Sequence, residues 1–147
     1  MQKDHKLIDV FQKYVKLTPE KSIIKIIEVR LSDFNFKGKN NRTYISTRSI
    51  KHVYDKRPAE EFDRCILILN EIIKNPTEVY DNLSKEGKRG SILLSYKDVY
   101  GQRYVCSLEE SDEPAAYKVV TFFRIRKENY LNGYKLIWSQ EGGTPLS

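Results

Sequence analysis

The first apolar pattern along the chain has helical spacing. Leu7, Phe11 and Tyr14 share one side of residues 4–17, which predicts a short amphipathic helix. A Thr-Pro step follows and ends it, because proline has no N–H group to continue a helix. A second short helix is expected around residues 47–55, where a Ser-Thr pair offers N-cap side chains.

The clearest helix is expected at residues 59–74. Its apolar side chains repeat every three or four positions, as they do on the buried face of a helix. These side chains are Phe62, Cys65, Ile66, Leu69, Ile72 and Ile73. Asn75-Pro76 ends the pattern, because proline disfavours the helical conformation of the residue before it. We expect this apolar stripe to pack against the strands that follow.

Strand patterns occupy most of the remaining chain. Ile and Val enrichment favours a strand over residues 22–31, and turn residues between positions 34 and 46 favour a hairpin. Short segments rich in Val, Ile, Tyr and Phe then cover residues 78–82, 91–96, 103–109, 117–125 and 134–138. Their connections are too short for parallel crossovers, so consecutive strands should be antiparallel. Helices followed by such a meander indicate an α+β fold.

Length and composition restrict the class of protein. A chain of 147 residues favours one domain, and 39% apolar content excludes wholesale disorder. No apolar run approaches the length of a membrane span, and charges interrupt the N-terminus where a signal peptide needs apolar residues. We therefore expect a cytoplasmic protein that does not act at a membrane.

The cysteines and histidines argue against a metal site. Cys65 falls on the apolar stripe of a helix and Cys106 lies in an apolar strand, so both are expected as small buried side chains. The chain has only two histidines, and the usual zinc ligand sets cannot be assembled from them. No metal and no other cofactor is expected.

Positive charge is concentrated in two segments. The formal net charge is +6, and residues 35–57 hold seven basic side chains against one acidic side chain. The loop SKEGKRG adds Lys85, Lys88 and Arg89. Basic clusters interleaved with Tyr and Phe suit a phosphate backbone and base stacking, so the two segments are expected to form one phosphate-binding surface. Solvated lysines on an ordinary basic protein are the alternative.

One histidine lies where it could carry chemistry. His52 precedes Lys56 by four residues, so both would share a helix face. Metal-free RNA cleavage needs a base for the 2′-OH proton, an acid for the leaving oxygen, and fixed cations or donors for the charged phosphorane. Histidine titrates near neutrality and suits either proton-transfer role. A structural role for His52 is the alternative.

From Thr43 to its end, the chain resembles the phage-borne branch of the barnase–EndoU–colicin–RelE (BECR) superfamily of metal-independent ribonucleases. The segments that carry the resemblance are TYIS, SIKHV-x-x-K, EIIKNPTEVY, KRGSILL, YVCSLE, VVTFFR and YKLIWSQEGGTP. The resemblance implies N-terminal helices packed on a four- to five-stranded antiparallel sheet. Residues 43–147 would form this BECR-like domain, and residues 1–42 would be an extension, helix plus strand, packed on it.

The resemblance also implies a polar site. Its catalytic residues would be His52, Lys56, Arg89 and Thr121. The residues expected to bind RNA phosphates or bases nearby are Arg48, Lys51, Tyr54, Lys88 and Arg124. In a regular strand Arg124 would lie on the opposite face from Thr121, since strand faces alternate.

The function expected from these observations is a toxin-like, metal-independent endoribonuclease of a phage or mobile element. It would cleave RNA, tRNA being one substrate class, by 2′-OH attack that leaves a 2′,3′-cyclic phosphate. Its setting would be the cytoplasm of a phage-infected or prophage-carrying bacterium, with a cognate inhibitor protein as a partner. The alternatives are a non-catalytic nucleic-acid- or protein-binding module of the same fold, and a purely structural protein of a phage or mobile element. An enzyme should bring His52, Lys56 and Thr121 into one polar cleft, whereas a binder needs only a broad basic face.

Overall fold

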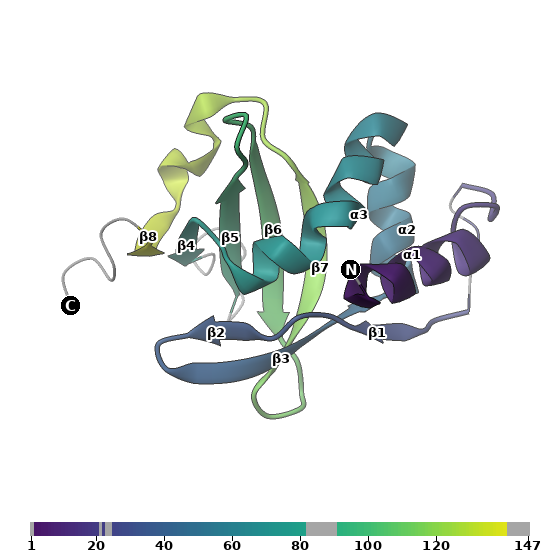
Figure 1. The fold of residues 1–147 in the computed structure, drawn as a ribbon, viewed down its shortest axis with the longest axis horizontal. Coiled ribbons are helices and arrows are strands. Elements are labelled where there is room, and N and C mark those ends of the chain that lie inside the picture. Colours follow the sequence, from purple (N-terminus) through teal and green to yellow (C-terminus); the bar gives the residue numbers. More distant parts are fainter. Residues whose placement is uncertain (1, 21, 23–24, 82–90, 141–147) are drawn as a thin grey trace.

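Three helices pack on one face of an open sheet in the computed structural model of the chain (Figure 1). The structure describes residues 2–20, 22, 25–81 and 91–140. The sheet has eight strands and is mixed but mostly antiparallel, so the expected α+β class is confirmed. The expectation of four to five strands is too low, and the expectation of an entirely antiparallel sheet is wrong at one pairing.

The helices fall where the sequence predicts them. They are α1 (Gln2–Tyr14), α2 (Thr47–Lys56) and α3 (Ala59–Lys74). Ser46 caps α2, since its Oγ accepts a hydrogen bond from the backbone N–H of Ser49 at 3.1 Å. The predicted α3 stripe is buried and packs on β5, β6 and β7 of the sheet, as expected. Helix α1 packs across α2 and α3.

The strands lie in the segments predicted for them. Their bounds are β1 (Glu28–Arg30), β2 (Phe34–Phe36), β3 (Lys39–Ser46), β4 (Glu78–Asp81), β5 (Ile92–Lys97), β6 (Arg103–Glu110), β7 (Ala116–Arg124) and β8 (Lys135–Ser139). The order across the sheet is β1-β3-β7-β6-β5-β4-β8, and β2 also pairs with β3. Of the strand expected over residues 22–31, the described residues form strand only in β1.

The parallel pairing joins β3 to β7. Thr43 lies opposite Tyr117, and both strands run in the same direction. The rule of short connections applies to consecutive strands, and β4–β5, β5–β6 and β6–β7 obey it. It does not constrain β3 and β7, because two helices and three strands separate them along the chain.

Two apolar clusters cover the two faces of the sheet. The larger one lies between the helices and the sheet and includes both cysteines, which are buried free thiols as expected. The smaller cluster, on Tyr80, Leu93 and Val105, lies on the opposite face. A 3-10 helix, η1 (Glu128–Gly133), covers it with Tyr130 and other side chains. The chain therefore folds back over the sheet after β7 ends, and this leaves a cleft beside the strand ends.

The described part of the chain contains no helix that is both long and apolar enough to cross a membrane. The longest helix, α3, has 16 residues and carries two glutamates in its first turn. Its apolar residues form one stripe that faces the sheet, so it is a helix of the protein core.

Candidate functional site

The two principal residues of the predicted site lie on the solvent side of α2. His52 and Lys56 are exposed, as is Arg48 one turn earlier. The opposite side of α2 packs into the larger apolar cluster through Ile50 and Val53. The helix therefore presents His52 and Lys56 on one solvent face, as their spacing predicts, and Arg48 is exposed one turn before them.

Two of the residues predicted to bind RNA phosphates or bases make contacts inside the protein instead. Lys51 is only 4% exposed, and its Nζ donates to Asp55 at 3.2 Å and to the backbone oxygen of Thr18 at 3.3 Å. Tyr54 is half-buried, with its ring 5.2 Å from that of Phe11 and 5.1 Å from that of Phe62. Tyr54 therefore packs between the helices, and Lys51 is held against the segment that follows α1.

Thr121 lies on the sheet face that the helices leave uncovered. It pairs with Ser107, whose strand neighbours Cys106 and Leu108 both face the helices. A β-bulge at Val120 follows from the register shift in this strand pair. Thr121 therefore projects from a different face than the solvent side of α2, and the structure does not gather it with His52 and Lys56. Lys88 and Arg89 lie outside the described residues.

A cleft lies at the end of the sheet where β5 turns into β6 and β7 ends. This end of the sheet is at the top of Figure 1. We call it the basic cleft, and its volume is about 560 Å³. Five of its twelve lining residues are basic and one is acidic. The basic residues are Lys97, Arg103, Arg124, Arg126 and Lys127, and the acidic residue is Glu78. This concentration of cations suits an anionic ligand.

Hydrogen bonds hold one of the two carboxylate oxygens of Glu78. Oε1 accepts hydrogen bonds from Tyr80 Oη at 2.8 Å and from Arg103 Nη1, and Arg103 Nη1 also donates to Ser95 Oγ at 3.1 Å. Oε2 has no hydrogen-bond partner among the described residues. All four side chains project from the sheet face opposite the helices, because each alternates along its strand with a residue of the larger cluster.

Tyr80 remains a hydrogen-bond donor to this carboxylate. Burial, followed by the hydrogen bond to Glu78, raises the pKa of the Tyr80 phenol well above its ordinary value of 10.0. The phenol is therefore protonated at neutral pH. Within the described ranges, no group of three or more His, Cys, Asp or Glu residues is arranged to hold a metal ion.

Three cations of the basic cleft have no carboxylate partner among the described residues. Lys97, Arg124 and Lys127 make no ion pair with any residue in the described part of the chain. Arg126, by contrast, pairs with Glu61 near the start of α3. Unpaired cations around a fixed carboxylate form a site that can bind a phosphate and accept a proton next to it.

Glu61 anchors one wall of the basic cleft. It is buried, and its Oε2 accepts the backbone N–H of Arg124 at 3.1 Å while Oε1 pairs with Arg126. A second hollow of about 200 Å³ adjoins the cleft here and shares Gln102, Arg124 and Arg126 with it. The cationic surface therefore continues from the sheet end to the first turn of α3.

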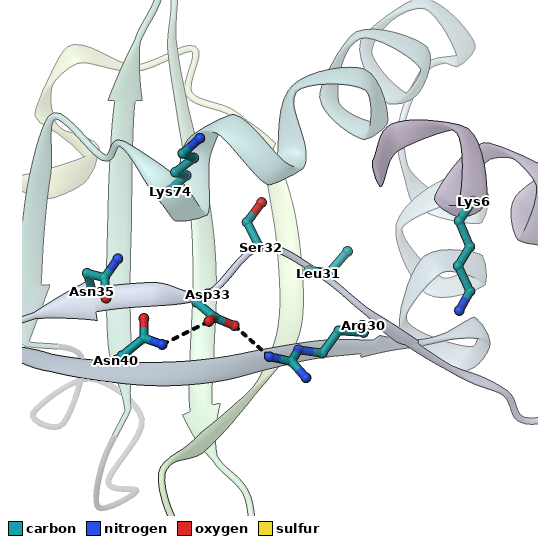
Figure 2. Close-up of a pocket in the computed structure, with 8 residues that line it drawn as sticks. All are labelled: Lys6, Arg30, Leu31, Ser32, Asp33, Asn35, Asn40 and Lys74. Atoms are coloured by element: carbon teal, nitrogen blue, oxygen red, sulfur yellow. Dashed lines mark hydrogen bonds and ion pairs between the residues drawn. The ribbon is translucent and has the colours of Figure 1, made fainter. Parts of the chain in front are cut away.

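A further hollow of about 570 Å³ lies between the β1–β2 segment and the end of α3 (Figure 2). Asp33 at its centre accepts from Arg30 at 2.8 Å and from Asn40 at 2.9 Å. Lys74 extends away from this group in Figure 2. Each oxygen of the Asp33 carboxylate already accepts a hydrogen bond. This hollow therefore lacks the reactive group that Glu78 supplies in the basic cleft.

The main residues of the basic cleft were absent from the sequence-predicted site, with Arg124 as the exception. The signal that could have identified them is the run Arg-Ile-Arg-Lys at residues 124–127, a basic cluster at a predicted strand end. Glu78 and Arg103 lie on strands that are not neighbours, with β5 between them. Their contact depends on the strand order, which local patterns do not encode.

No protein-family model, curated protein sequence or solved structure matches this chain. The evidence for function is therefore the chemistry of the basic cleft, together with the charge and motifs of the sequence.

Proposed function

We propose that this protein is a metal-independent endoribonuclease whose reaction takes place in the basic cleft. The observation that carries the proposal is the state of Glu78. One carboxylate oxygen is held by Tyr80 and Arg103, and the other has no hydrogen-bond partner in the described ranges, so we assign it to a substrate proton. A carboxylate held in this way among cations combines the two requirements of metal-free RNA cleavage, proton removal and phosphorane stabilisation.

Glu78 acts as the general base. Its Oε2 takes the proton of a ribose 2′-OH, and the 2′-oxygen attacks the adjacent phosphorus. The bond to the 5′-oxygen breaks, and the products are a 2′,3′-cyclic phosphate and a 5′-hydroxyl that receives its proton from water. Tyr80 and Arg103 are positioning residues for the carboxylate, because both contact Oε1.

Lys127 and Arg124 bind the reacting phosphate. As predicted, Arg124 starts from the face opposite Thr121, because it pairs with the helix-side residue Tyr104; it lies at the end of β7, where it lines both hollows. Both lack a carboxylate partner among the described residues, so their charge is available to a ligand. Cations fixed before the reaction stabilise the additional negative charge of the phosphorane more than that of the starting diester. These two side chains should therefore act on the rate as well as on binding.

The resemblance to BECR nucleases favours the same reaction class, although the catalytic residues that it implies are His52, Lys56, Arg89 and Thr121. Among the segments that carry it, EIIKNPTEVY contains Glu78 and Tyr80, and VVTFFR ends with Arg124. The three helices on one sheet face agree with the arrangement that the resemblance implies. The predicted proton-transfer role of His52 is a competing location for the same reaction, and one experiment separates the two.

The test is cleavage of single-stranded RNA, tRNA and total RNA in EDTA by the wild type and by three variants. Glu78→Gln keeps the shape of the side chain but cannot take a proton, so the rate should fall about 10²- to 10⁴-fold. Glu110→Gln is the matched control, because Glu110 is an exposed carboxylate at the other end of β6. It should retain the wild-type rate. His52→Ala should also retain it.

Four outcomes would contradict parts of the proposal. Loss of activity in His52→Ala with full activity in Glu78→Gln would move the reaction to α2. Activity that EDTA abolishes would exclude this mechanism, because the mechanism uses no metal ion. Equal cleavage of DNA would also exclude it, because DNA lacks the attacking hydroxyl. A wild type that binds RNA but cleaves none would favour the non-catalytic binding module.

A further inference from the structure

The turn between β5 and β6 exposes two apolar side chains beside the basic cleft. Val99 is 91% exposed and Tyr100 is 82% exposed, although large apolar residues usually find cover. Lys97, two residues before Val99, and residues 101–103, directly after Tyr100, line the basic cleft. Tyr100 is therefore exposed and directly precedes Gly101, which lines the cationic site.

This turn is a defined structure. Asp98 Oδ1 accepts the backbone N–H groups of Tyr100 and Gln102, each at 2.9 Å. The Asp98 side chain is 4% exposed, and its other oxygen lies 3.7 Å from Arg64 of α3. Gly101 adopts φ +83°, a left-handed conformation that glycine accepts without strain. The ring of Tyr100 is therefore presented by a fixed backbone, which lowers the entropy cost of binding through it.

We propose that Tyr100 is a base-stacking residue, and that the basic cleft therefore takes single-stranded RNA. This inference rests on the proposed function, which supplies the nucleic-acid ligand. An exposed aromatic ring beside a track of cations is the combination that binds single strands, since each base offers a face to the ring while the cations hold the phosphates. The cations here are Lys97, Arg103, Arg124 and Lys127.

A duplex cannot use this arrangement. In A-form RNA the bases are stacked on one another, and proteins contact mostly phosphates and 2′-hydroxyls. Tyr100 would gain nothing from a paired base, so its contribution should be specific to unpaired nucleotides. The cations would still attract a duplex. The ratio of the affinity for a single strand to the affinity for a duplex is therefore the quantity that tests the proposal.

The experiment measures the dissociation constants of single-stranded and duplex oligonucleotides at one fixed salt concentration. The single strand is made of 2′-deoxynucleotides so that it cannot be cleaved. Tyr100→Ala should weaken its binding about 5- to 150-fold, the range for loss of one stacked base, and should leave duplex binding within 2-fold. Tyr100→Phe keeps the ring and should stay within about 3-fold of the wild type. Val99→Ala, the matched control one residue earlier, should also bind normally.

An abasic nucleotide supplies the second arm. A strand with abasic sites throughout keeps every phosphate but has no base to stack, so Tyr100→Ala and the wild type should bind it equally. Unchanged single-strand affinity in Tyr100→Ala would overturn the proposal. A loss of duplex and abasic-strand affinity equal to the loss for the normal single strand would also overturn it. Either result would leave the turn as a protein contact. Failure of RNA cleavage with Tyr100-dependent binding intact would contradict the proposed function alone.

Discussion

Burial keeps both thiols of this protein neutral. Cys65 packs inside the α3 stripe and Cys106 lies in the middle of β6. Burial raises the pKa of Cys65 from its ordinary value of 9.0 to about 12, and it raises the pKa of Cys106 further. Neither thiol is therefore a nucleophile at physiological pH, which agrees with the sequence-based expectation of two structural side chains.

The stability of the fold should decrease in alkaline solution. Above pH 9 the unfolded chain releases its thiol protons, whereas the folded chain retains them up to about the raised pKa of Cys65. The unfolded state then binds fewer protons, so the free energy of unfolding falls as pH rises. Between pH 9 and pH 10 the expected loss is about 1 kcal/mol for each thiol. Urea unfolding at both pH values, with a reductant present, measures it.

A cysteine variant isolates this contribution from that of the tyrosines. Burial also raises the pKa of Tyr80 and Tyr117, and these phenols add to the same loss as pH rises. Cys65→Ala should show a smaller decrease between pH 9 and pH 10, by about 1 kcal/mol. An identical decrease in the wild type and the variant would show that Cys65 is not buried as described.

Packing of α3 on the sheet is the main contact between the layers, and one side chain at its centre tests it. Leu69 is fully buried between the helices and the sheet. Leu69→Ala should lower the free energy of unfolding by about 2–5 kcal/mol, because it leaves a cavity that the surrounding strands cannot close. Leu67→Ala, two positions earlier on the exposed side of the same helix, should cost less than about 1 kcal/mol. Comparable losses in both variants would contradict the assigned orientation of α3.

Elements could be predicted from sequence where their signal is local. The stripe from Phe62 to Ile73 and the turn chemistry between consecutive strands are such signals, and the α3 helix and the antiparallel pairs follow from them. The parallel β3–β7 pair and the pairing of β8 with β4 have no local signal. They depend on which strand edges remain open after the meander has formed, so the strand count and the strand order could not be predicted.

The salt dependence of RNA binding should show which cations of the molecule contact the phosphates. Arg124→Ala and Lys127→Ala each remove a cation of the basic cleft, so each should reduce the slope of log affinity against log salt by about 0.7 for single strands. Lys39→Ala removes an exposed cation of the predicted 35–57 basic segment, away from the cleft. It should leave the slope unchanged. A smaller slope in Lys39→Ala alone would favour that segment as the phosphate-binding surface.

The site was harder to predict than the fold because it is assembled from four strands. The spacing of His52 and Lys56 predicts a shared helix face, and the structure places both on one face of α2. The cluster on Glu78 has no such spacing, because its partners come from β4, β5 and β6. Chemistry that depends on sheet order becomes visible only when the order is known.

The parallel pair has a consequence for synthesis on the ribosome. Arg42 and Pro114, which are joined by a hydrogen bond next to this pair, lie 72 residues apart in the chain. At about 5–20 residues per second, β3 waits on the order of 4 to 15 s for β7 to be translated, and longer for it to leave the exit tunnel. During that time one edge of β3 has unpaired backbone groups, which is the condition under which nascent chains aggregate or recruit chaperones.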